Sequence, residues 1–232
     1  MNIFVTGASK GIGKAIAEEL KSVGDVFVTG RNEQALQKLN CKYCVCDLSK
    51  NLDELKKFIL DNKIDVIINN AAEYIYSGLE ALKAEDIRRL YKTNLIAPAE
   101  LIATAIPYMK KNKWGRVINI GSISGVMGEA NASIYSSSKA GLLGLTKALA
   151  LEVAEHNITV NTINPGWVET RLGIDSIEES EFTQDEIIEC VPQKRFIKPR
   201  EIAKLCKYLI SDDAKGITGQ GINLCAGLSV GI

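Results

Sequence analysis

The stretch that decides the fold lies at the N-terminus and reads Asn2-Ile3-Phe4-Val5-Thr6-Gly7-Ala8-Ser9-Lys10-Gly11-Ile12-Gly13. Residues 2–6 form a short apolar run that ends at a glycine, which is typical of a buried parallel strand. After the glycines, apolar residues recur at helical spacing at Ile12, Ile16, Ala17 and Leu20. The stretch therefore predicts a strand, a sharp glycine-rich turn and a helix, in that order.

Short apolar runs continue to alternate with helical patterns along the rest of the chain. Further strands are predicted at residues 25–29, 43–46, 64–68, 116–120, 159–163 and 222–224. Helical patterns cover residues 51–61, 82–111, 134–154 and 200–210. This alternation predicts an α/β fold, a Rossmann-type doubly wound parallel sheet of about seven strands with helices on both faces. Because no linker, repeat or low-complexity segment interrupts the pattern, we expect residues 1–232 to form a single domain.

Composition excludes two broad classes of function. The chain has 28 lysines and arginines and 28 aspartates and glutamates, which leaves a formal net charge of zero and no polycationic surface for nucleic acid. No apolar run approaches the roughly 18 residues that cross a membrane. The first strand begins too close to Met1 for a signal peptide. We therefore expect a cytoplasmic protein whose six cysteines are reduced thiols.

Three of the cysteines, Cys41, Cys44 and Cys46, cluster in the sequence. A structural metal site usually needs four ligands, and the only histidine is His156. Strand periodicity places Cys44 and Cys46 on one face and Cys41 nearer a turn. We expect buried strand cysteines here and no metal site, with a metal or redox role as the alternative.

The glycine-rich turn is typical of a dinucleotide-binding site. Its glycines allow backbone amides to approach a pyrophosphate, and the N-terminus of the following helix favours the anion. Cofactor contacts are therefore predicted at Gly7, Ala8, Ser9, Lys10, Gly11 and Ile12. The spacing is Gly-x-x-x-Gly-x-Gly rather than the more common Gly-x-Gly-x-x-Gly, and a sharp turn without a ligand is the alternative.

The end of the second predicted strand indicates which dinucleotide would bind. Many such folds place an acid there for the ribose diol, but this strand ends Gly30-Arg31-Asn32. Arg31 is suited to a 2′-phosphate through charge-assisted hydrogen bonds, and Lys10 offers a second cation. The pair favours NADP(H) over NAD(H). The alternative is that Arg31 and Lys10 are ordinary solvated surface residues.

Tyr135 and Lys139 are four residues apart at the start of the helix predicted over residues 134–154. At this spacing the two side chains share one helical face. The lysine charge should favour the phenolate and lower the tyrosine pKa from its ordinary value of about 10. A phenol whose pKa approaches the working pH is a good proton donor, so the pair predicts general acid catalysis. The alternative is an ordinary surface pair.

Two more polar residues lie where a site would form. Ser122 follows Gly121 at the carboxyl end of the strand predicted over residues 116–120, and open parallel sheets bind ligands at that edge. Asn94 lies among apolar residues of a predicted helix. A buried amide needs hydrogen-bond partners, so Asn94 is either structural or part of the site.

Six motifs occur in one order: Thr6-Gly7-x-x-x-Gly11-x-Gly13, Asn69-Asn70-Ala71, Asn94, Ser122, Tyr135-x-x-x-Lys139 and Pro165-Gly166. Together they resemble the short-chain dehydrogenase/reductase family over essentially the whole chain. The resemblance implies that Tyr135 donates a proton, that Lys139 lowers its pKa and holds the nicotinamide ribose, and that Ser122 binds the carbonyl oxygen. It also implies that Asn94 holds a water in a proton relay behind Lys139.

The same resemblance implies the remaining cofactor contacts and no metal. Asp47 and Leu48 would meet the adenine, and Asn70, followed by Ala71, would meet the adenosine side. Val168 and Thr170 would meet the nicotinamide carboxamide, just after the Pro165-Gly166 turn. The cofactor would carry the hydride, while the phenol and the serine hydroxyl would polarise the carbonyl.

Within the family the chain is most similar to 3-oxoacyl-[acyl-carrier-protein] reductases, through residues 115–122, 140–142 and 217–220. NADPH-dependent reduction of a 3-oxoacyl thioester is therefore expected. The alternatives are reduction of a sugar or other small ketone, oxidation of such an alcohol, and a catalytically silent NADP-binding regulator. A cluster of lysines would either meet an acidic carrier protein or form a solvated helix end; it comprises Lys110, Lys111 and Lys113.

Two positions depart from the family pattern. Ala72 stands where the family usually has glycine, and its methyl group would crowd a turn near the cofactor. Cys225-Ala226-Gly227 stands where the family often has Asp-Gly-Gly, which affects local packing and not the chemistry.

Residues 167 to about 199 show poor periodicity and many acids, namely Glu178, Glu179, Glu181, Asp185, Glu186 and Glu189. We expect a mobile substrate lid there with a short helix near residues 185–190.

Elsewhere, the helices near 94–111 and 134–154 carry small apolar residues, at Ala97, Ala99, Ala103, Ala140, Leu143 and Ala148. With the family resemblance, these predict a homotetramer, or a dimer.

Overall fold

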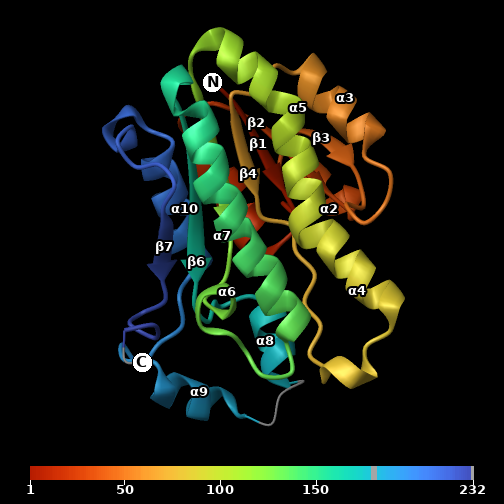
Figure 1. Ribbon diagram of the computed structural model, residues 1–232, viewed down its shortest axis with the longest axis vertical. Helices are drawn as coiled ribbons and strands as arrows, with labels where there is room; N and C mark the ends of the chain where they lie inside the picture. Colours follow the sequence, from red (N-terminus) through yellow and green to blue (C-terminus); the bar gives the residue numbers. More distant parts are fainter. Residues whose placement is uncertain (179–181, 231–232) are drawn as a thin grey trace.

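The computed structural model describes residues 1–178 and 182–230. Within these ranges seven parallel strands form one sheet in the order β3-β2-β1-β4-β5-β6-β7 (Figure 1). The strands are β1 (Asn2–Thr6), β2 (Asp25–Gly30), β3 (Lys42–Val45), β4 (Val66–Asn69), β5 (Gly115–Ile120), β6 (Ile158–Pro165) and β7 (Gly221–Leu224). This confirms the predicted α/β fold and places every predicted strand within about two residues.

The helices that connect the strands are α1 (Gly11–Leu20), α2 (Glu33–Gln37), α3 (Asp53–Asp61), α4 (Ala84–Tyr91), α5 (Ala97–Asn112), α6 (Ser124–Met127), α7 (Ser133–Val153), α8 (Arg171–Glu178), α9 (Gln184–Cys190) and α10 (Pro199–Leu209). A π-helical turn, η2 (Lys92–Ile96), joins α4 to α5. Three short 3-10 turns are η1 (Leu79–Ala81), η3 (Ala154–His156) and η4 (Asp212–Ala214).

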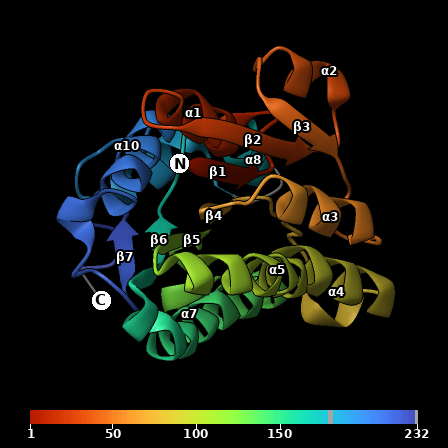
Figure 2. The ribbon, with the colours of Figure 1, turned by 90° about the horizontal axis from the view of Figure 1, so that it is seen from above.

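The sheet is buried on both faces because its side chains alternate between two helical layers. Ile3 packs with Ile16 of α1 and Ile202 of α10 on one face. Phe4, the next residue, packs with Leu101 of α5 on the other face, which α3 and α7 also cover (Figure 2). Central strands covered on both faces are continuously apolar, which is why short β-branched runs in the sequence were sufficient to predict them.

The strand order reverses between β1 and β4, which are neighbours in the sheet. Ligands bind at such a switch point, outside the carboxyl ends of the strands. The glycine-rich turn after β1 and the Asn70-Ala71 turn after β4 meet there. A Cβ on Gly13 would lie 2.4 Å from both Gly7 O and Asn70 Nδ2, so only glycine allows this approach.

Two helical segments differ from the sequence-based prediction. The 82–111 pattern comprises α4, η2 and α5, because the chain widens to a π-helical turn around Asn94. The 167–199 segment contains the expected helix as α9, but also α8, which was not predicted. Leu172 and Ile174 of α8 are exposed and only Ile177 is deeply buried, so its apolar stripe is too narrow to read. Glu179 and Glu181 lie outside the described residues.

The three clustered cysteines are half-buried, not buried as expected. Cys44 lies in β3, and Cys41 and Cys46 flank it; this strand is at the edge of the sheet, so one side of it faces solvent. Cys44 and Cys46 do share a face, against the layer that contains Phe4, while Cys41 packs on the opposite layer. Burial raises the pKa of the Cys46 thiol to about 11, which disfavours the reactive thiolate.

The described ranges contain no group of three or more His, Cys, Asp or Glu side chains arranged for a metal ion. No helix within them has both the length and the apolar character to cross a membrane.

Candidate active site

A cavity of about 1110 Å³ opens at the carboxyl edge of the sheet. Its walls come from the turn after β1, the ends of β2 to β6, and α8. The volume suits a dinucleotide together with a small substrate. Apart from Ala8 and Asn94, all of the predicted site residues line it.

Ala8 supports the glycine-rich turn on the side away from the cavity. It is fully buried, and its backbone N–H donates to Thr29 O at 3.0 Å. Gly7 adopts a φ of +69°, and a Cβ there would lie 2.8 Å from Ala71 Cα. The turn is therefore held rigidly between β2 and β4, with the N-terminus of α1 facing the cavity.

The far end of the cavity offers groups for a phosphate. Lys10 and Arg31 line it, are exposed, and form no ion pair within the described residues. Ser9 contributes a buried hydroxyl that has no hydrogen-bond partner. A Cβ on Gly30 would lie 2.3 Å from that hydroxyl oxygen. An unsatisfied hydroxyl beside two cations fits the 2′-phosphate end of NADP(H).

Asp47 and Leu48 form the neighbouring wall, directly after β3. Asp47 accepts hydrogen bonds from Ser49 N at 3.0 Å and from Ser49 Oγ at 2.8 Å. Burial alone would raise the pKa of Asp47, but these bonds and the nearby charge of Arg31 lower it overall. The carboxylate is thus fixed at the place where the adenine was expected.

Asn70 links the turn after β4 to the turn after β1 through hydrogen bonds at the centre of the site. Its Nδ2 donates to Thr6 O at 2.9 Å and to Gly7 O at 3.3 Å. Thr6 Oγ1 accepts from the backbone N–H groups of Asn70 and Ala71, both at 2.9 Å. Both amide donors of Asn70 therefore support the glycine turn, while the residue itself lines the cavity.

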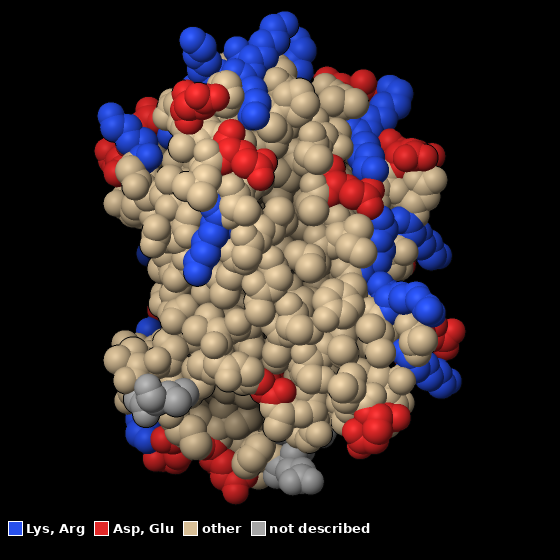
Figure 3. All heavy atoms as spheres, in the orientation of Figure 1, with Lys and Arg blue, Asp and Glu red and all other residues tan. Residues whose placement is uncertain are grey.

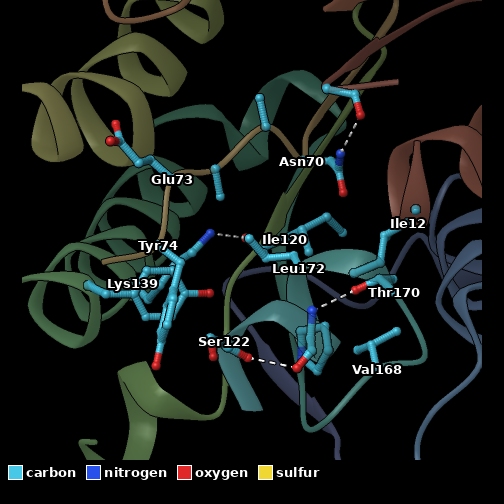
Figure 4. A pocket seen from close by; sticks show the side chains of 18 of the residues that line it. Ile12, Asn70, Glu73, Tyr74, Ile120, Ser122, Lys139, Val168, Thr170 and Leu172 are labelled. Atoms are coloured by element: carbon cyan, nitrogen blue, oxygen red, sulfur yellow. Dashed lines mark hydrogen bonds between the residues drawn. The ribbon is translucent and has the colours of Figure 1, made fainter. Parts of the chain in front are cut away.

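Ser122, Tyr135 and Lys139 come together at the inner end of the cavity, where β5 ends and α7 begins. Figure 4 shows Ser122 and Lys139 around the same space, with Tyr74 beside them. Lys139 is 3% exposed and its Nζ donates to Ile120 O at 2.8 Å. That nitrogen is 5.6 Å from the centre of the Tyr135 ring, so the amine lies over the face of the phenol ring.

The predicted lowering of the Tyr135 pKa is wrong for this state of the protein. Burial raises the pKa of Tyr135 to about 12, against a smaller lowering effect of the Ser122 hydroxyl. Burial also lowers the pKa of Lys139 to about 8. The spacing of the pair was correct, but the sequence could not show that both groups are buried, and burial opposes both charges.

Asn94 lies behind the cavity, fully engaged by protein groups. Its Oδ1 accepts from Glu73 N at 2.8 Å, and its Nδ2 donates to Glu73 O at 2.8 Å and to Ser138 Oγ at 3.2 Å. It therefore joins the loop after β4 to helix α7, one residue from Lys139. Its expected role in holding a water stays a prediction.

The turn after β6 forms the wall where the nicotinamide was expected. Gly166 N donates to Leu224 O at 3.0 Å, and Val168 pairs with Ile197 in an isolated bridge. These bonds hold Val168 and Thr170 at the mouth, and a Cβ on Gly11 would lie only 3.4 Å from Thr170 Cγ2. Residues 168 and 170 thus approach the glycine turn across the cavity.

Comparison with known proteins agrees with this geometry. A family model described as enoyl-(acyl carrier protein) reductase matches residues 7–229. The 3-oxoacyl-[acyl-carrier-protein] reductase FabG of Rickettsia conorii is 37% identical over 97% of this chain and 95% of its own. This chain belongs to the short-chain dehydrogenase/reductase family. As a member, it is an NAD(P)-dependent oxidoreductase.

Two further relatives show how far the similarity extends. The D-beta-hydroxybutyrate dehydrogenase of Rhizobium meliloti is 34% identical, over 96% of each chain. A variant of actinorhodin polyketide ketoreductase, whose crystal structure is with NADPH, has a TM-score of 0.92 and 33% identity. That comparison covers 98% of this chain and 96% of the ketoreductase.

The two departures from the short-chain dehydrogenase/reductase pattern have different structural consequences. Ala72 lines the cavity and is not among the residues with a left-handed backbone, so its methyl group causes no backbone strain there. Ala226 has a φ of +54°, the left-handed region that favours glycine. Alanine at that position costs roughly 1 kcal/mol relative to glycine.

Sequence reasoning missed two residues on the substrate side, Tyr74 and Glu129. Both line the cavity, and Tyr74 OH donates to Glu129 Oε1 at 2.7 Å. The Tyr74 ring lies edge-on to the Tyr135 ring, with centroids 4.9 Å apart. An acid six residues before Tyr135 was a visible signal, but its partner is 55 residues away in the sequence.

Replacing Lys139 with Met should stabilise the protein at pH 7. Lowering the lysine pKa from 10.5 to about 8 corresponds to a folding penalty of about 3 kcal/mol, partly offset by the hydrogen bond to Ile120. A net gain of about 2 kcal/mol should raise Tm by about 4–8 °C for a domain of this size. Differential scanning calorimetry measures it.

The pH dependence provides the check. Because the folded pKa lies below the unfolded one, the unfolded state binds more protons between pH 8 and 10.5, and wild-type stability rises across that window. The Tm difference between Lys139→Met and wild type should therefore shrink as pH rises. Lys147→Met, at an exposed site on the same helix, is the control. A lower Tm for Lys139→Met at pH 7 would contradict the argument.

Proposed function

We propose that this protein reduces the keto group of a 3-oxoacyl thioester to a secondary alcohol, with NADPH as the reductant. The observation that carries the proposal is the convergence of Ser122, Tyr135 and Lys139 at the inner end of a cavity that begins at the glycine turn. The similarity to FabG and to a polyketide ketoreductase supports an acyl-thioester substrate.

The chain's own residues would act on the carbonyl oxygen. When bound, the cofactor supplies the hydride. The Ser122 hydroxyl would donate a hydrogen bond to the keto oxygen, which orients and polarises the carbonyl. The Tyr135 hydroxyl would give its proton to the same oxygen as negative charge develops there. With a pKa near 12, the phenol carries its proton at neutral pH and so has a proton to donate.

Lys139 would hold the nicotinamide ribose next to this acid, as the family resemblance implies. Its position is set by the bond to Ile120 O, and by Asn94, which fixes the neighbouring turn of α7 through Ser138. The turn containing Val168 and Thr170 would bind the nicotinamide carboxamide. Ser9, Lys10 and Arg31 would bind the 2′-phosphate.

A second candidate is a dehydrogenase or reductase of a smaller hydroxy or keto compound, which the similarity to D-beta-hydroxybutyrate dehydrogenase favours. A panel of ketones and acyl thioesters assayed with NADPH separates the two. Any turnover would exclude a silent NADP-binding regulator, which the intact set of polar residues already disfavours.

The lysine cluster at residues 110–113 does not support docking of a carrier protein at the cavity. It lies at the end of α5, where the chain enters β5, and so at the amino edge of the sheet. Figure 1 shows that end of α5 at the opposite end of the molecule from α6 and α8. A carrier protein that delivers its acyl group to the cavity would have to bind elsewhere.

Tyr135→Phe should abolish turnover and leave cofactor binding largely intact. The variant loses only the proton donor, and general acid catalysis typically contributes about 10²- to 10⁴-fold. Steady-state NADPH oxidation measures the loss, and titration of NADPH fluorescence checks binding. Activity above about a tenth of the wild-type value would show that another group is the acid.

The protein should prefer NADPH to NADH by at least about tenfold in kcat/KM, which is only 1.4 kcal/mol. The cations at Lys10 and Arg31, without an acid after β2, are the reason. Arg31→Ala should remove most of the preference, whereas Arg200→Ala, at an exposed arginine on α10, should not. Equal use of both cofactors by the wild type would contradict the proposal.

The segment from residue 167 to 199 should open without ligand and close over bound NADPH and a substrate analogue. Val168, Val191 and Ile197 are buried in the main core near the two ends of the segment. Between those ends the apolar anchor is small: Ile177 and Ile187 form one cluster with Phe196 and Trp167, whose ring centres are 6.4 Å apart. Segments with few buried contacts open most easily. Hydrogen exchange in residues 167–178 and 182–199 should slow on ligand addition. Equally slow exchange in both states would make this segment a fixed wall.

We also propose a homotetramer. Figure 3 shows a largely uncharged face over α5 and α7. Of the six small residues predicted to pack between subunits, Ala103, Ala140 and Ala148 are exposed, while Ala97 is buried within the subunit itself. In the single chain, the Leu151 side chain of α7 is 86% exposed. Light scattering should give four times the 25.3 kDa chain mass, and a concentration-independent monomer would overturn the proposal.

A further inference from the structure

The carboxylate of Glu129 lies on the substrate side of the cavity and has no part in the proposed reaction. It accepts two short hydrogen bonds, from Ser124 Oγ at 2.6 Å and from Tyr74 OH at 2.7 Å. Both donors are neutral hydroxyls. They orient the carboxylate but do not cancel its charge.

Glu129 is close to the reacting groups on both sides. Ser124 Oγ lies 3.1 Å from Ser122 Oγ, so the carboxylate is two hydrogen bonds from the hydroxyl that would hold the keto oxygen. Through Tyr74 it also adjoins the ring of Tyr135. Burial is the main cause that raises the pKa of Tyr135, and the charge of Glu129 raises it further, so this charge is felt at the phenol.

The loop that contains Glu129 is fastened to the opposite wall. Ser77 N donates to Asn131 O at 2.6 Å, and Asn131 Nδ2 donates to Tyr76 OH at 3.1 Å. With the bond between Tyr74 and Glu129, these contacts join residues 74–77 to residues 129–131. These bonds hold the half-buried carboxylate at one place in the wall of the cavity.

No cation within the described residues pairs with Glu129. The other carboxylate on this side, Glu73, is different, because Arg89 Nη2 lies 2.7 Å from its Oε1 and balances it. Lys139 is buried and its amine donates to Ile120 O, so it makes no ion pair with Glu129. Glu129 is thus a carboxylate on the substrate side that forms no ion pair with the described residues.

We propose that Glu129 is a specificity-determining residue that rejects substrates with a carboxylate next to the keto group and restricts the enzyme to neutral 3-oxoacyl thioesters and esters. In a free 3-oxo acid, one methylene separates the carboxylate from the keto carbon. Binding the ketone at Ser122 would bring that second anion towards Glu129, and the two like charges would repel each other. A thioester at the same position carries no charge. The inference rests on the proposed reductase function.

The test compares a neutral and an anionic substrate of similar size. We would measure kcat/KM with NADPH for acetoacetyl-N-acetylcysteamine thioester, methyl acetoacetate and acetoacetate. Glu129→Gln removes the charge and keeps an oxygen that can accept one of the two hydroxyl bonds. It should raise kcat/KM for acetoacetate at least about tenfold relative to the values for both neutral substrates, because any effect on Ser122 or on the phenol acts on all three substrates alike.

Two matched variants separate charge from other effects. Tyr74→Phe removes one hydrogen bond to Glu129 but keeps the charge, so rejection of acetoacetate should persist. Glu155→Gln removes the same charge from η3, at the other end of α7, where the side chain is 80% exposed. It should leave the ratio of acetoacetate to methyl acetoacetate at the wild-type value.

The outcomes are distinct. If the wild type reduces the thioester but Glu129→Gln does not raise acetoacetate activity, the inference is wrong and the proposed function stands. If the wild type reduces no 3-oxoacyl thioester, the proposed function itself is wrong. If Glu129→Gln fails to fold, the wild type decides: it must prefer methyl acetoacetate to acetoacetate at least about tenfold, with the gap narrowing as salt rises. Equal use of the two would overturn the inference.

Discussion

The hydrogen-bonded contact between the ends of β1 and β4 is the constraint on which the site depends. Thr6 Oγ1 accepts two backbone N–H bonds from the turn after β4, and Asn70 Nδ2 donates back to Thr6 O. The contact forms only because Gly7 and Gly13 have no side chains where the Asn70 amide lies. It fixes the glycine turn at the point where the strand order reverses. The N-terminus of α1 and the end of β4 consequently face one cavity.

A chain of buried polar side chains positions α7 on this frame. Asn69 Nδ2 donates to Asn119 Oδ1 at 2.9 Å, Asn119 Nδ2 donates to Thr146 Oγ1 at 2.9 Å, and Thr146 Oγ1 lies 2.7 Å from Thr162 Oγ1. The chain crosses β4, β5, α7 and β6. A shift of the helix would leave buried donors and acceptors unpaired, which is costly. The network therefore specifies where Tyr135 and Lys139 enter the cavity.

The sequence predicted those parts of the molecule whose physical cause is local. The β-branched runs gave the seven strands, and three glycines near the end of β1 gave the turn. Helix α8 was missed because two of its apolar residues, Leu172 and Ile174, face solvent. The pKa of Tyr135 was wrong because its direction depends on burial, which the i and i+4 spacing does not determine. Glu129 was missed because its partners come from loops that only the fold brings together.

The features that the sequence predicted and those that it missed lie in different halves of the cavity. The half expected to bind the cofactor is formed by backbone turns at strand ends. Because such turns need glycines at fixed positions, this half can be recognised in the sequence. The half expected to bind the substrate is formed by side chains of residues 73–77, 122–131, 168–176 and 182–187, joined across long sequence separations. Such contacts can change without disturbing the sheet or the glycine turn. Short motifs therefore indicate the reaction class, whereas specificity has to be argued from side chains such as Glu129 that the fold brings to the cavity wall.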